Sequence, residues 1–369
     1  MLVTIVAGAR PNFMKIAPII KAIKKARAEG GDIQYRLVHT GQHYDKKMSG
    51  DFFEQLGIPD PDVNLECGGG TQAEQTAAIM VKFEKDLMET KPSVVLVVGD
   101  VTSTMACSIA AKKLCIDVVH VEAGIRSGDM TMPEEINRIV TDSICDHFFT
   151  TSEYANDNLR KYQVADSRIH FVGNTMIDTL YQNLEKLKQP FFWNDYQLSS
   201  GNYFLVTLHR PSNVDDPEKL RQILDAITNA TSQYPVVFPV HPRTRKVMEA
   251  NNISSKKLIM IDPLGYHEFI YLVKNAKGVI TDSGGITEEA TVLHVPCLTL
   301  RNSTERPETV TMGTNELIGD DFDKLEKCLE QIVNGQWKAG NIPPFWDGQT
   351  SDRIVAILQN IYSNVLQLS

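Results

Sequence analysis

The chain alternates short apolar runs with longer segments in which apolar residues recur at helical spacing. Runs rich in Val and Ile occupy residues 2–7, 34–39, 93–98, 117–121, 147–150 and 169–172. Between them, apolar residues repeat every three or four positions, as do Ile16, Ile19, Ile20 and Ile23. Strands and helices in alternation predict a parallel sheet with helices on both faces.

The alternation pauses near residues 186–195 and then restarts, with strands predicted near 203–208, 236–240, 258–261, 278–281 and 296–300. A last helix is predicted near 350–367. We therefore expect two Rossmann-like, doubly wound α/β domains that face a cleft. Residues 1–172 would form the first domain and 173–350 the second, with the boundary between them near 173–190, and a terminal helix at 351–369 would pack back on the first. Ligands of such sheets bind at the carboxyl ends of the strands.

The composition fits a globular protein of two domains. Of 369 residues, 42% are hydrophobic and 22% are charged. The net charge of -9 argues against a general polyanion-binding surface, so nucleic acid is not expected as a partner. No apolar run approaches the length of a membrane span and no basic leader opens the chain, so we expect no membrane association and a cytoplasmic location. The six cysteines lack metal-ligand spacing, and we expect reduced thiols, mostly in the core.

A glycine turn, Asp282-Ser283-Gly284-Gly285, follows an apolar run and precedes a helical pattern. A strand, a turn and a helix N-terminus in succession present unpaired backbone N–H groups and the positive end of the helix dipole, which suit a phosphate. The two glycines let a diphosphate approach the backbone closely. One turn into the helix, Glu288 or Glu289 could accept hydrogen bonds from ribose hydroxyls. The pattern predicts a site for a nucleotide with a sugar attached.

Charged residues also follow the strands of the first domain. Arg10 and Lys15 come after the first strand, where they could contact an anionic ligand or form a solvated turn. Asp100 follows the strand at 93–98 and could be a helix cap or a catalytic carboxylate. Glu122 ends an apolar strand, where a charge is costly to bury unless it has a partner or a task. These residues would line one wall of a site.

The helix predicted from residue 133 begins with two more acids, Glu134 and Glu135. They could complement the helix dipole or add carboxylates to the same wall. Arg138 lies four positions after Glu134, a spacing that could fix that carboxylate and keep it ionised.

Two strands of the second domain end in histidine and arginine. His209 and Arg210 follow the strand at 203–208, and His241 and Arg243 follow the strand at 236–240. Imidazole titrates near neutral pH and guanidinium binds phosphate, so these pairs favour acid–base chemistry beside a phosphate. A metal site is the alternative, but the interleaved arginines would repel a cation. Arg306 follows the strand at 296–300 and is also placed for a phosphate.

Taken together, the motifs resemble the non-hydrolysing UDP-N-acetylglucosamine 2-epimerase family. They run in the family's order: GARP at 8–11, VGD at 98–100, HVEAGIR at 120–126, PEEINR at 133–138, TLHR at 207–210, VHP at 240–242, TDSGGITEE at 281–289 and STERP at 303–307. Each motif is weak, but the ordered set is highly specific. The resemblance implies a GT-B-like fold, usually a homodimer, and interconversion of UDP-GlcNAc and UDP-ManNAc for surface polysaccharides.

The resemblance also implies a role for each matching residue. UDP would be held by Arg10, Lys15, Ser283, Gly284, Gly285, Glu289 and Arg306, with Phe269 against the uracil and Leu264 at a neighbouring position that is polar in the family. The catalytic set would be Asp100, Glu122, Glu134 and His209, supported by Arg138. The family is thought to expel UDP, form 2-acetamidoglucal and add UDP back. No NAD, metal or other cofactor is expected.

Two departures from the family bear on regulation and substrate. Some bacterial members bind a second UDP-GlcNAc as an activator; Gln42, Glu135, Arg210 and His241 retain part of that site, but Asp45 replaces an expected glutamine. Residues 67–70 also supply no arginine, so little or no activation is expected, and a sigmoidal rate curve would contradict this. The short segment 126–132 resembles a branch that includes epimerases of UDP-2,3-diacetamido-2,3-dideoxyglucuronic acid. A GT-B glycosyltransferase, a hydrolysing epimerase and a non-catalytic nucleotide-sugar sensor are the alternatives.

Overall fold

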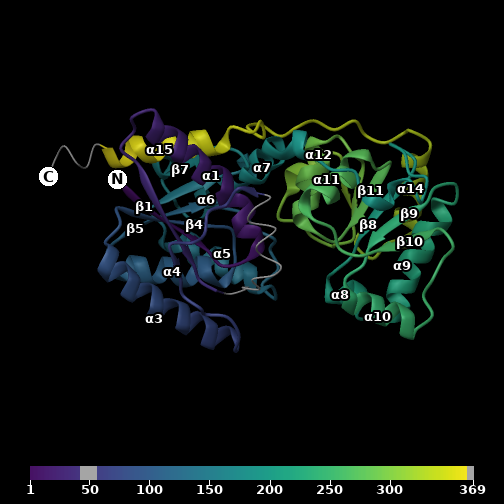
Figure 1. The fold of residues 1–369 in the computed structure, drawn as a ribbon, viewed down its shortest axis with the longest axis horizontal. Helices are drawn as coiled ribbons and strands as arrows, with labels where there is room; N and C mark the ends of the chain where they lie inside the picture. The colour runs from purple at the N-terminus through teal and green to yellow at the C-terminus, as the bar shows by residue number, and fades with distance from the viewer. Residues whose placement is uncertain (42–55, 364–369) are drawn as a thin grey trace. The chain divides into compact units, whose positions relative to one another are not determined.

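The computed structural model describes residues 1–41 and 56–363 and divides into two compact units. Unit 1 comprises Met1–Gln182 and Pro344–Ser369, and unit 2 comprises Asn183–Pro343. Each unit has one parallel sheet with helices on both faces (Figure 1). The predicted fold class of two Rossmann-like parallel-sheet domains is confirmed.

Unit 1 contains seven parallel strands in the order β3-β2-β1-β4-β5-β6-β7. The strands are β1 (Leu2–Ala7), β2 (Gln34–His39), β3 (Val63–Asn64), β4 (Val94–Val98), β5 (Asp117–Val121), β6 (His147–Thr150) and β7 (Ile169–Phe171). The helices are α1 (Arg10–Ala28), α3 (Gln72–Thr90), α4 (Thr102–Lys113), α5 (Pro133–Ile144), α6 (Glu153–Lys161), α7 (Thr175–Asn183) and α15 (Thr350–Ser363), with a 3-10 turn at Asp166–Arg168.

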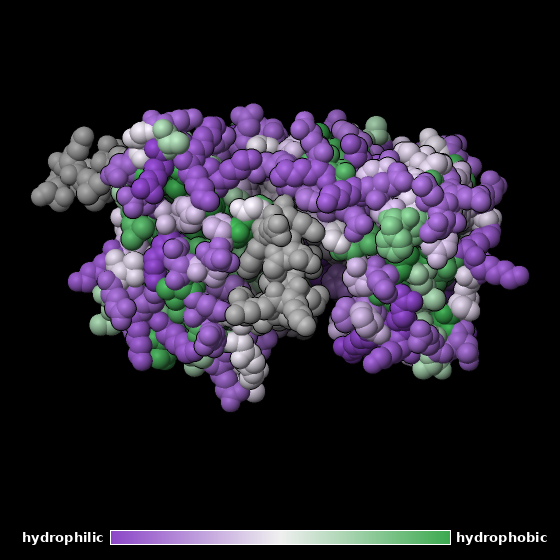
Figure 2. All heavy atoms as spheres, in the orientation of Figure 1, coloured by the Kyte–Doolittle hydropathy of each residue, from purple (hydrophilic) through white to green (hydrophobic). Residues whose placement is uncertain are grey.

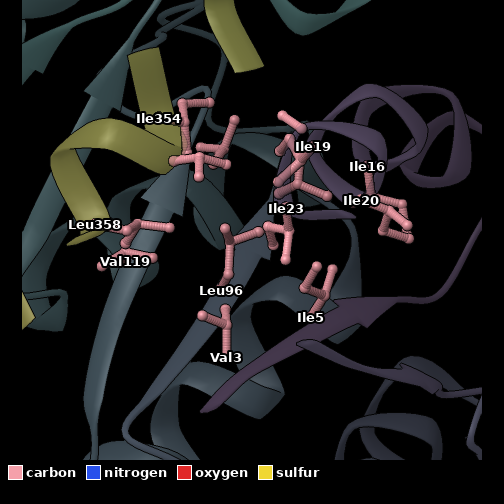
Figure 3. Close-up of a cluster of buried hydrophobic side chains, with 14 of the residues drawn as sticks. Val3, Ile5, Ile16, Ile19, Ile20, Ile23, Leu96, Val119, Ile354 and Leu358 are labelled. Carbon is pink, nitrogen blue, oxygen red and sulfur yellow. The ribbon is translucent and has the colours of Figure 1, made fainter. Parts of the chain in front are cut away.

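The two faces of this sheet bury separate cores because successive strand residues point to opposite sides. Val3, Ile5 and Leu96 pack against α1 and α15 on one face (Figure 3). On the other face, Val95 and Val97 pack in one cluster with residues of α3 and α4. Figure 1 shows α1 and α15 on one side of the sheet and α3 and α4 on the other. The helical spacing of isoleucines in α1 thus provides the buried stripe predicted from the sequence.

The residues after unit 2 return to complete unit 1. Asp178 of α7 accepts hydrogen bonds from the backbone N–H groups of Thr350 (3.0 Å) and Ser351 (2.6 Å) at the start of α15. Trp346 Nε1 donates to the Thr151 carbonyl at 3.0 Å, and α15 adds residues such as Leu358 to the core. The first boundary of unit 1, at 182/183, lies within the expected range of 173–190. The second, at 343/344, lies before the expected 350/351, because the segment before α15 also packs on unit 1.

Unit 2 contains six parallel strands in the order β10-β9-β8-β11-β12-β13. The strands are β8 (Phe204–Thr207), β9 (Val236–Pro239), β10 (Leu258–Ile261), β11 (Gly278–Thr281), β12 (Cys297–Thr299) and β13 (Asn315–Leu317). The helices are α8 (Pro211–Val214), α9 (Pro217–Ala230), α10 (Pro242–Ala250), α11 (Tyr266–Asn275), α12 (Gly284–Val292), α13 (Pro307–Thr311) and α14 (Phe322–Val333), with 3-10 turns at Leu184–Lys186 and Phe191–Trp193. One core lies against α9, α10 and α14 and the other against α11 and α12.

The surface and the cysteines agree with a globular protein. On the face drawn in Figure 2, hydrophobic residues are scattered among hydrophilic ones. All six cysteines fall in the described residues and are free, and only Cys115 is exposed. Among residues 1–41 and 56–363, no helix is both long enough and apolar enough to cross a membrane.

The lowered pKa values of two histidines in unit 1 predict that the protein loses stability in acid. Burial lowers the pKa of His39 to about 4, and burial together with the neighbouring His147 lowers that of His170 to about 4. The unfolded chain takes up these protons near pH 6.5, before the folded protein does, so stability falls as the pH drops from about 6.5 to 4. Between pH 7 and pH 5, wild type should lose about 2 kcal/mol more than His170→Gln in urea unfolding. The exposed His294 is the control: His294→Asn should follow wild type, and an unchanged slope in His170→Gln would contradict the prediction.

Candidate functional site

Each sheet reverses its strand order once, between β1 and β4 in unit 1 and between β8 and β11 in unit 2. In open α/β sheets, ligands bind at the carboxyl ends of the strands next to such a reversal. Lys15 and Asp100 follow β1 and β4, and His209 and Asp282 follow β8 and β11. These sequence-predicted residues therefore lie where such a ligand would bind in each unit.

The turn after β1 is held against the end of β4 by Asn12. Its Oδ1 accepts hydrogen bonds from the backbone N–H groups of Gly8 (3.1 Å) and Ala9 (3.0 Å), and its Nδ2 donates to the Val98 carbonyl at 3.0 Å. This buried amide fixes the start of α1, one turn before Lys15.

Lys15 forms an ion pair with Glu122, which follows β5. The Lys15 and Glu122 side chains are only 12% and 4% exposed. Gly99 lies beside the pair with φ +69°, and a Cβ there would stand 3.2 Å from Lys15 Nζ and 3.4 Å from Glu122 Oε2. Lys15 thus neutralises the buried carboxylate that the sequence marked as needing a partner.

Glu122 itself has a left-handed backbone with φ +74°. This conformation is strained for a residue with a side chain and persists where the surrounding structure enforces it. Here the Glu122 N–H donates to the Phe149 carbonyl at 2.9 Å, and the N–H of Ala123 donates to the same carbonyl at 3.1 Å. Such strain is common at functional sites.

Asp100 pairs with Arg138 of α5 and does not cap α4. The N-cap of α4 is Val101, whereas Arg138 Nε (3.0 Å) and Nη2 (2.6 Å) both donate to Asp100 Oδ2. The Arg138 side chain is buried, and the Asp100 side chain is 30% exposed. Asp100 is therefore a positioned carboxylate that solvent still reaches.

Arg138 Nη1 also donates to Glu135 Oε2 at 2.5 Å. The side chain of Glu134, the partner suggested by sequence spacing, forms no hydrogen bond or ion pair with a described residue. Glu135 is buried and also accepts hydrogen bonds from the N–H groups of Ser127 and Gly128, both at 3.0 Å. Burial opposes its ionisation, but these donors and Arg138 hold its pKa below the usual range. Glu135 fixes the loop before α5, whereas Glu134 is half-exposed.

A buried histidine, His120, contacts the turn at Gly99 after β4. His120 Nδ1 lies 2.7 Å from Asp142 Oδ1, and Nε2 lies 2.8 Å from the Gly99 carbonyl. Asp142 Oδ2 accepts from Arg126 Nη1 at 2.6 Å and from the Gly124 N–H at 3.0 Å. Although burial opposes ionisation, His120 and Arg126 lower the pKa of Asp142. The motif containing His120 was evident in the sequence, but its contact with Gly99 depends on the fold.

In unit 2, the two predicted histidines have different surroundings. His209 Nδ1 lies 2.8 Å from Oδ1 of the buried Asp282. His241 is the N-cap of α10, and its Nδ1 accepts from the Arg243 N–H at 3.3 Å. Arg243 pairs with Asp215 at 2.8 Å. In the described part of the chain, no group of three or more His, Cys, Asp or Glu residues could hold a metal ion.

The glycine turn leads into α12 as predicted. Ser283 is the N-cap residue, its side chain makes no capping hydrogen bond, and the first N–H groups of α12 have no acceptor within the helix. A Cβ on Gly285 would meet nothing within 4 Å. On Gly284 a Cβ would lie 3.4 Å from Arg301 Nη1 and 3.5 Å from Glu305 Oε1.

Arg301 follows β12 and lies beside the glycine turn, and sequence reasoning missed it. Its side chain is 4% exposed and pairs with Glu305 at 2.6 Å, while its Nη1 is buried without a hydrogen-bond partner among the described residues. Burial opposes ionisation of Glu305, but Arg301 and Arg306 hold its pKa at about 2. The guanidinium group of Arg301 therefore places a buried N–H donor, paired with Glu305, beside the N-terminus of α12.

The two acids of α12 each have a buried partner. Arg306 forms an ion pair with Glu288, and the Tyr266 hydroxyl donates to Glu289 Oε1 at 3.1 Å. Burial raises the pKa of Glu289 to about 8; the charge of Glu288 adds to this, and the Tyr266 hydrogen bond opposes it. Phe269 lies half-buried on α11, the helix that carries Tyr266.

Some predicted residues are placed only in part. Gln42 lies outside the described residues, and so does the side chain of Arg10, whose backbone begins α1. The backbone N–H of Arg210 donates to Asp282 Oδ2 at 2.9 Å.

Together, the two parallel sheets and the charged clusters at their carboxyl ends define a GT-B-like α/β protein. Residues 24–359 match the family model described as UDP-N-acetylglucosamine 2-epimerase. The chain belongs to this family, which confirms the resemblance seen in its motifs.

Individual relatives match nearly the whole chain. It is 43% identical over 370 residues to the UDP-N-acetylglucosamine 2-epimerase of Methanocaldococcus jannaschii, covering 97% of this chain and 99% of the relative. It is 38% identical over 364 residues to the UDP-2,3-diacetamido-2,3-dideoxy-D-glucuronate 2-epimerase of Pseudomonas aeruginosa. This match covers 98% of this chain and 100% of the relative. The crystal structure of the M. jannaschii enzyme with UDP-GlcNAc and UDP superposes with a TM-score of 0.85, at 42% identity and covering 98% of this chain and 100% of that one.

Proposed function

We propose that this protein is a non-hydrolysing UDP-N-acetylglucosamine 2-epimerase, an isomerase that interconverts UDP-GlcNAc and UDP-ManNAc. The observation that carries the proposal is the full-length similarity to the M. jannaschii epimerase, at 43% identity. The charged clusters at the two sheet reversals provide groups for each step of the reaction.

Unit 2 would hold UDP. The N-terminus of α12 and the neighbouring guanidinium groups of Arg301 and Arg306 suit the diphosphate, because unpaired N–H groups and positive charge both stabilise phosphate oxygens. Glu289 would accept hydrogen bonds from the ribose, and Phe269 would lie against the uracil. The family resemblance also assigns Arg10 and Lys15 to UDP binding.

Unit 1 would carry the proton chemistry. C2 of the sugar bears no strongly acidic proton, so direct abstraction is difficult. Instead, the C1–O bond would break with its electrons passing to the diphosphate, and a carboxylate would remove the C2 proton as the C1–C2 double bond forms. Reversal with proton delivery to the other face gives the epimer. Asp100, Glu122 and Glu134 are the candidate proton carriers, and the arginines and the helix N-terminus would stabilise the diphosphate.

A second substrate is favoured by two observations. The 38% identical P. aeruginosa relative is named for UDP-2,3-diacetamido-2,3-dideoxy-D-glucuronate, and the segment 126–132 resembles the shorter segment of the branch that includes such enzymes. Glu135 holds Ser127 and Gly128 of that segment in place. If this loop borders the sugar, it would select between an N-acetylhexosamine and a diacetamido-uronic acid.

The proposal is tested by incubating the purified protein with UDP-GlcNAc in deuterated water and following C2 by proton NMR. We expect UDP-ManNAc that carries deuterium at C2 and retains its UDP. Free ManNAc with UDP would instead indicate the hydrolysing reaction. No change with UDP-GlcNAc, followed by exchange with the diacetamido-uronate, would assign the second substrate. Inertness toward both would overturn the proposal and favour glycosyl transfer.

We further propose a homodimer in the cytoplasm that supplies surface polysaccharide precursors. The family resemblance supports the assembly and the pathway class. The six free cysteines are consistent with a reducing compartment. Light scattering on the purified protein would measure the assembly, and a mass equal to one 41.3 kDa chain would contradict the dimer.

The glycine turn gives a prediction with a matched control. Gly285→Ala should fold normally, because its Cβ meets no protein atom within 4 Å, but should weaken UDP binding about tenfold by occupying space next to the diphosphate. Gly284→Ala places its Cβ against the Arg301–Glu305 pair and should have a smaller effect. Calorimetric titration with UDP and thermal unfolding of both variants would measure this. Equal affinity in wild type and Gly285→Ala would place the diphosphate elsewhere.

A further inference from the structure

A fully buried carboxylate lies directly before the glycine turn. Asp282 follows β11, is 0% exposed, and receives hydrogen bonds from the polypeptide on several sides. Its Oδ2 accepts from the N–H of Arg210 at 2.9 Å and from Asn213 Nδ2 at 3.1 Å. The N–H of His209 lies 3.2 and 3.1 Å from its two oxygens.

The ring of His209 uses the same carboxylate. Its Nδ1 lies 2.8 Å from Asp282 Oδ1, yet the side chain is 60% exposed. A carboxylate can only accept, so Nδ1 carries the hydrogen and Nε2 is left as the second functional nitrogen. Nε2 makes no hydrogen bond to any residue in the described ranges.

The carboxylate is in its charged form. Burial alone would raise the pKa of Asp282, but hydrogen bonds and charge from His209, with donors from Arg210 and Asn213, lower it overall. A buried charge with this many donors is well placed to hold a neighbouring ring in one orientation and one tautomer.

We propose that Asp282 is a positioning residue for the epimerase reaction: it keeps His209 in the Nδ1–H form and directs Nε2 to the diphosphate next to Ser283. This inference rests on the proposed function. As the C1–O bond breaks, its electrons pass to a diphosphate oxygen. Nε2 would first take up a proton from solvent, which reaches the 60% exposed ring, and would then donate a hydrogen bond to that oxygen, while the Asp282 carboxylate holds Nδ1–H and balances the charge of the imidazolium.

The same contacts also allow a purely structural role, because Asp282 anchors the backbone after β8. The two roles separate in their response to chosen variants. Asp282→Asn keeps an oxygen for the backbone N–H groups but can present an amide donor to His209 Nδ1, which opposes the Nδ1–H tautomer. Asn213→Ala removes a structural donor and leaves the His209–Asp282 contact in place.

The experiment compares wild type, Asp282→Asn, Asn213→Ala, His209→Gln and the double variant Asp282→Asn/His209→Gln. Epimerisation kcat, UDP affinity and the nitrogen-15 NMR signals of labelled histidine are measured, and the His209 signals are assigned by their loss in His209→Gln. We expect Nδ1–H in wild type and Nε2–H in Asp282→Asn. We also expect kcat about a hundred- to ten-thousandfold lower in Asp282→Asn, UDP affinity within about threefold, and near wild-type kcat in Asn213→Ala.

If Asp282 acts through His209, the double variant should be no slower than His209→Gln, because the second change has nothing left to remove. If the losses of kcat in the two single variants multiply in the double variant, the proposal is overturned. A wild-type His209 in the Nε2–H form would also overturn it. The wild-type spectrum decides this even if Asp282→Asn does not fold. A wild type that epimerises neither UDP-sugar would refute the proposed function instead, and the tautomer measurement would still decide whether the pair exists.

Discussion

Replacing Asp100 with Asn should lower kcat about a hundred- to ten-thousandfold and leave UDP affinity within about threefold, because the amide cannot carry a proton in the reaction. Arg138 positions this carboxylate through Nε and Nη2, and 30% exposure keeps Asp100 within reach of solvent and substrate. Arg138 retains Glu135 as a partner in the variant, so the fold should survive. Deuterium incorporation at C2 and calorimetric titration with UDP would measure the two effects.

The matched control for Asp100→Asn is Asp86→Asn. Asp86 also pairs with an arginine, Arg36, through two contacts of 2.5 and 2.6 Å, but it lies on α3 and follows no strand. Its loss should lower stability without lowering kcat. A fully active Asp100→Asn would remove Asp100 from the mechanism.

The second large effect concerns the buried pair of Lys15 and Glu122. Glu122→Gln should abolish measurable turnover and also lower the free energy of unfolding by about 3–5 kcal/mol, because it leaves the Lys15 charge buried without its partner. Urea unfolding and C2 deuterium exchange would separate these two losses.

A double variant distinguishes the chemical role of Glu122 from its structural one. Lys15→Met/Glu122→Gln removes both charges and should recover most of the lost stability while staying inactive. Recovery of turnover in this variant would mean that Glu122 serves only to neutralise Lys15. Unchanged stability in Glu122→Gln would mean that the ion pair contributes little to the fold.

The sequence predicted most strands because parallel strands buried on both faces read as continuous apolar runs. The strand β3 was missed because Val63–Asn64 is too short for a pattern, and β13 was missed because Asn315–Leu317 contains only one apolar residue. The exact residues at which unit 1 ends and resumes were not predicted, for another reason. The contacts that attach α7 and the segment before α15 join residues far apart in the chain, and no local signal marks them.

The candidate site was predictable where a charged residue directly follows a strand, as at Asp100, Glu122 and His209. Their partners were less predictable. Helical spacing suggested Glu134 as the ion-pair partner of Arg138. The observed partners are Asp100, which follows β4, and Glu135, the next residue after Glu134. Asp282 was seen only as part of a glycine motif, because its contact with His209 requires β8 and β11 to be adjacent.

The return of residues 344–363 to unit 1 has a consequence for synthesis on the ribosome. Unit 2 is continuous in the chain, so it can complete its cores as soon as Pro343 has emerged. Unit 1 emerges first, yet it lacks α15, and with it Ile354 and Leu358 of its core, until unit 2 has been made. During translation, the apolar face of α1 therefore stays without α15 until the end of synthesis, and the unit that is synthesised first is the last to complete its core.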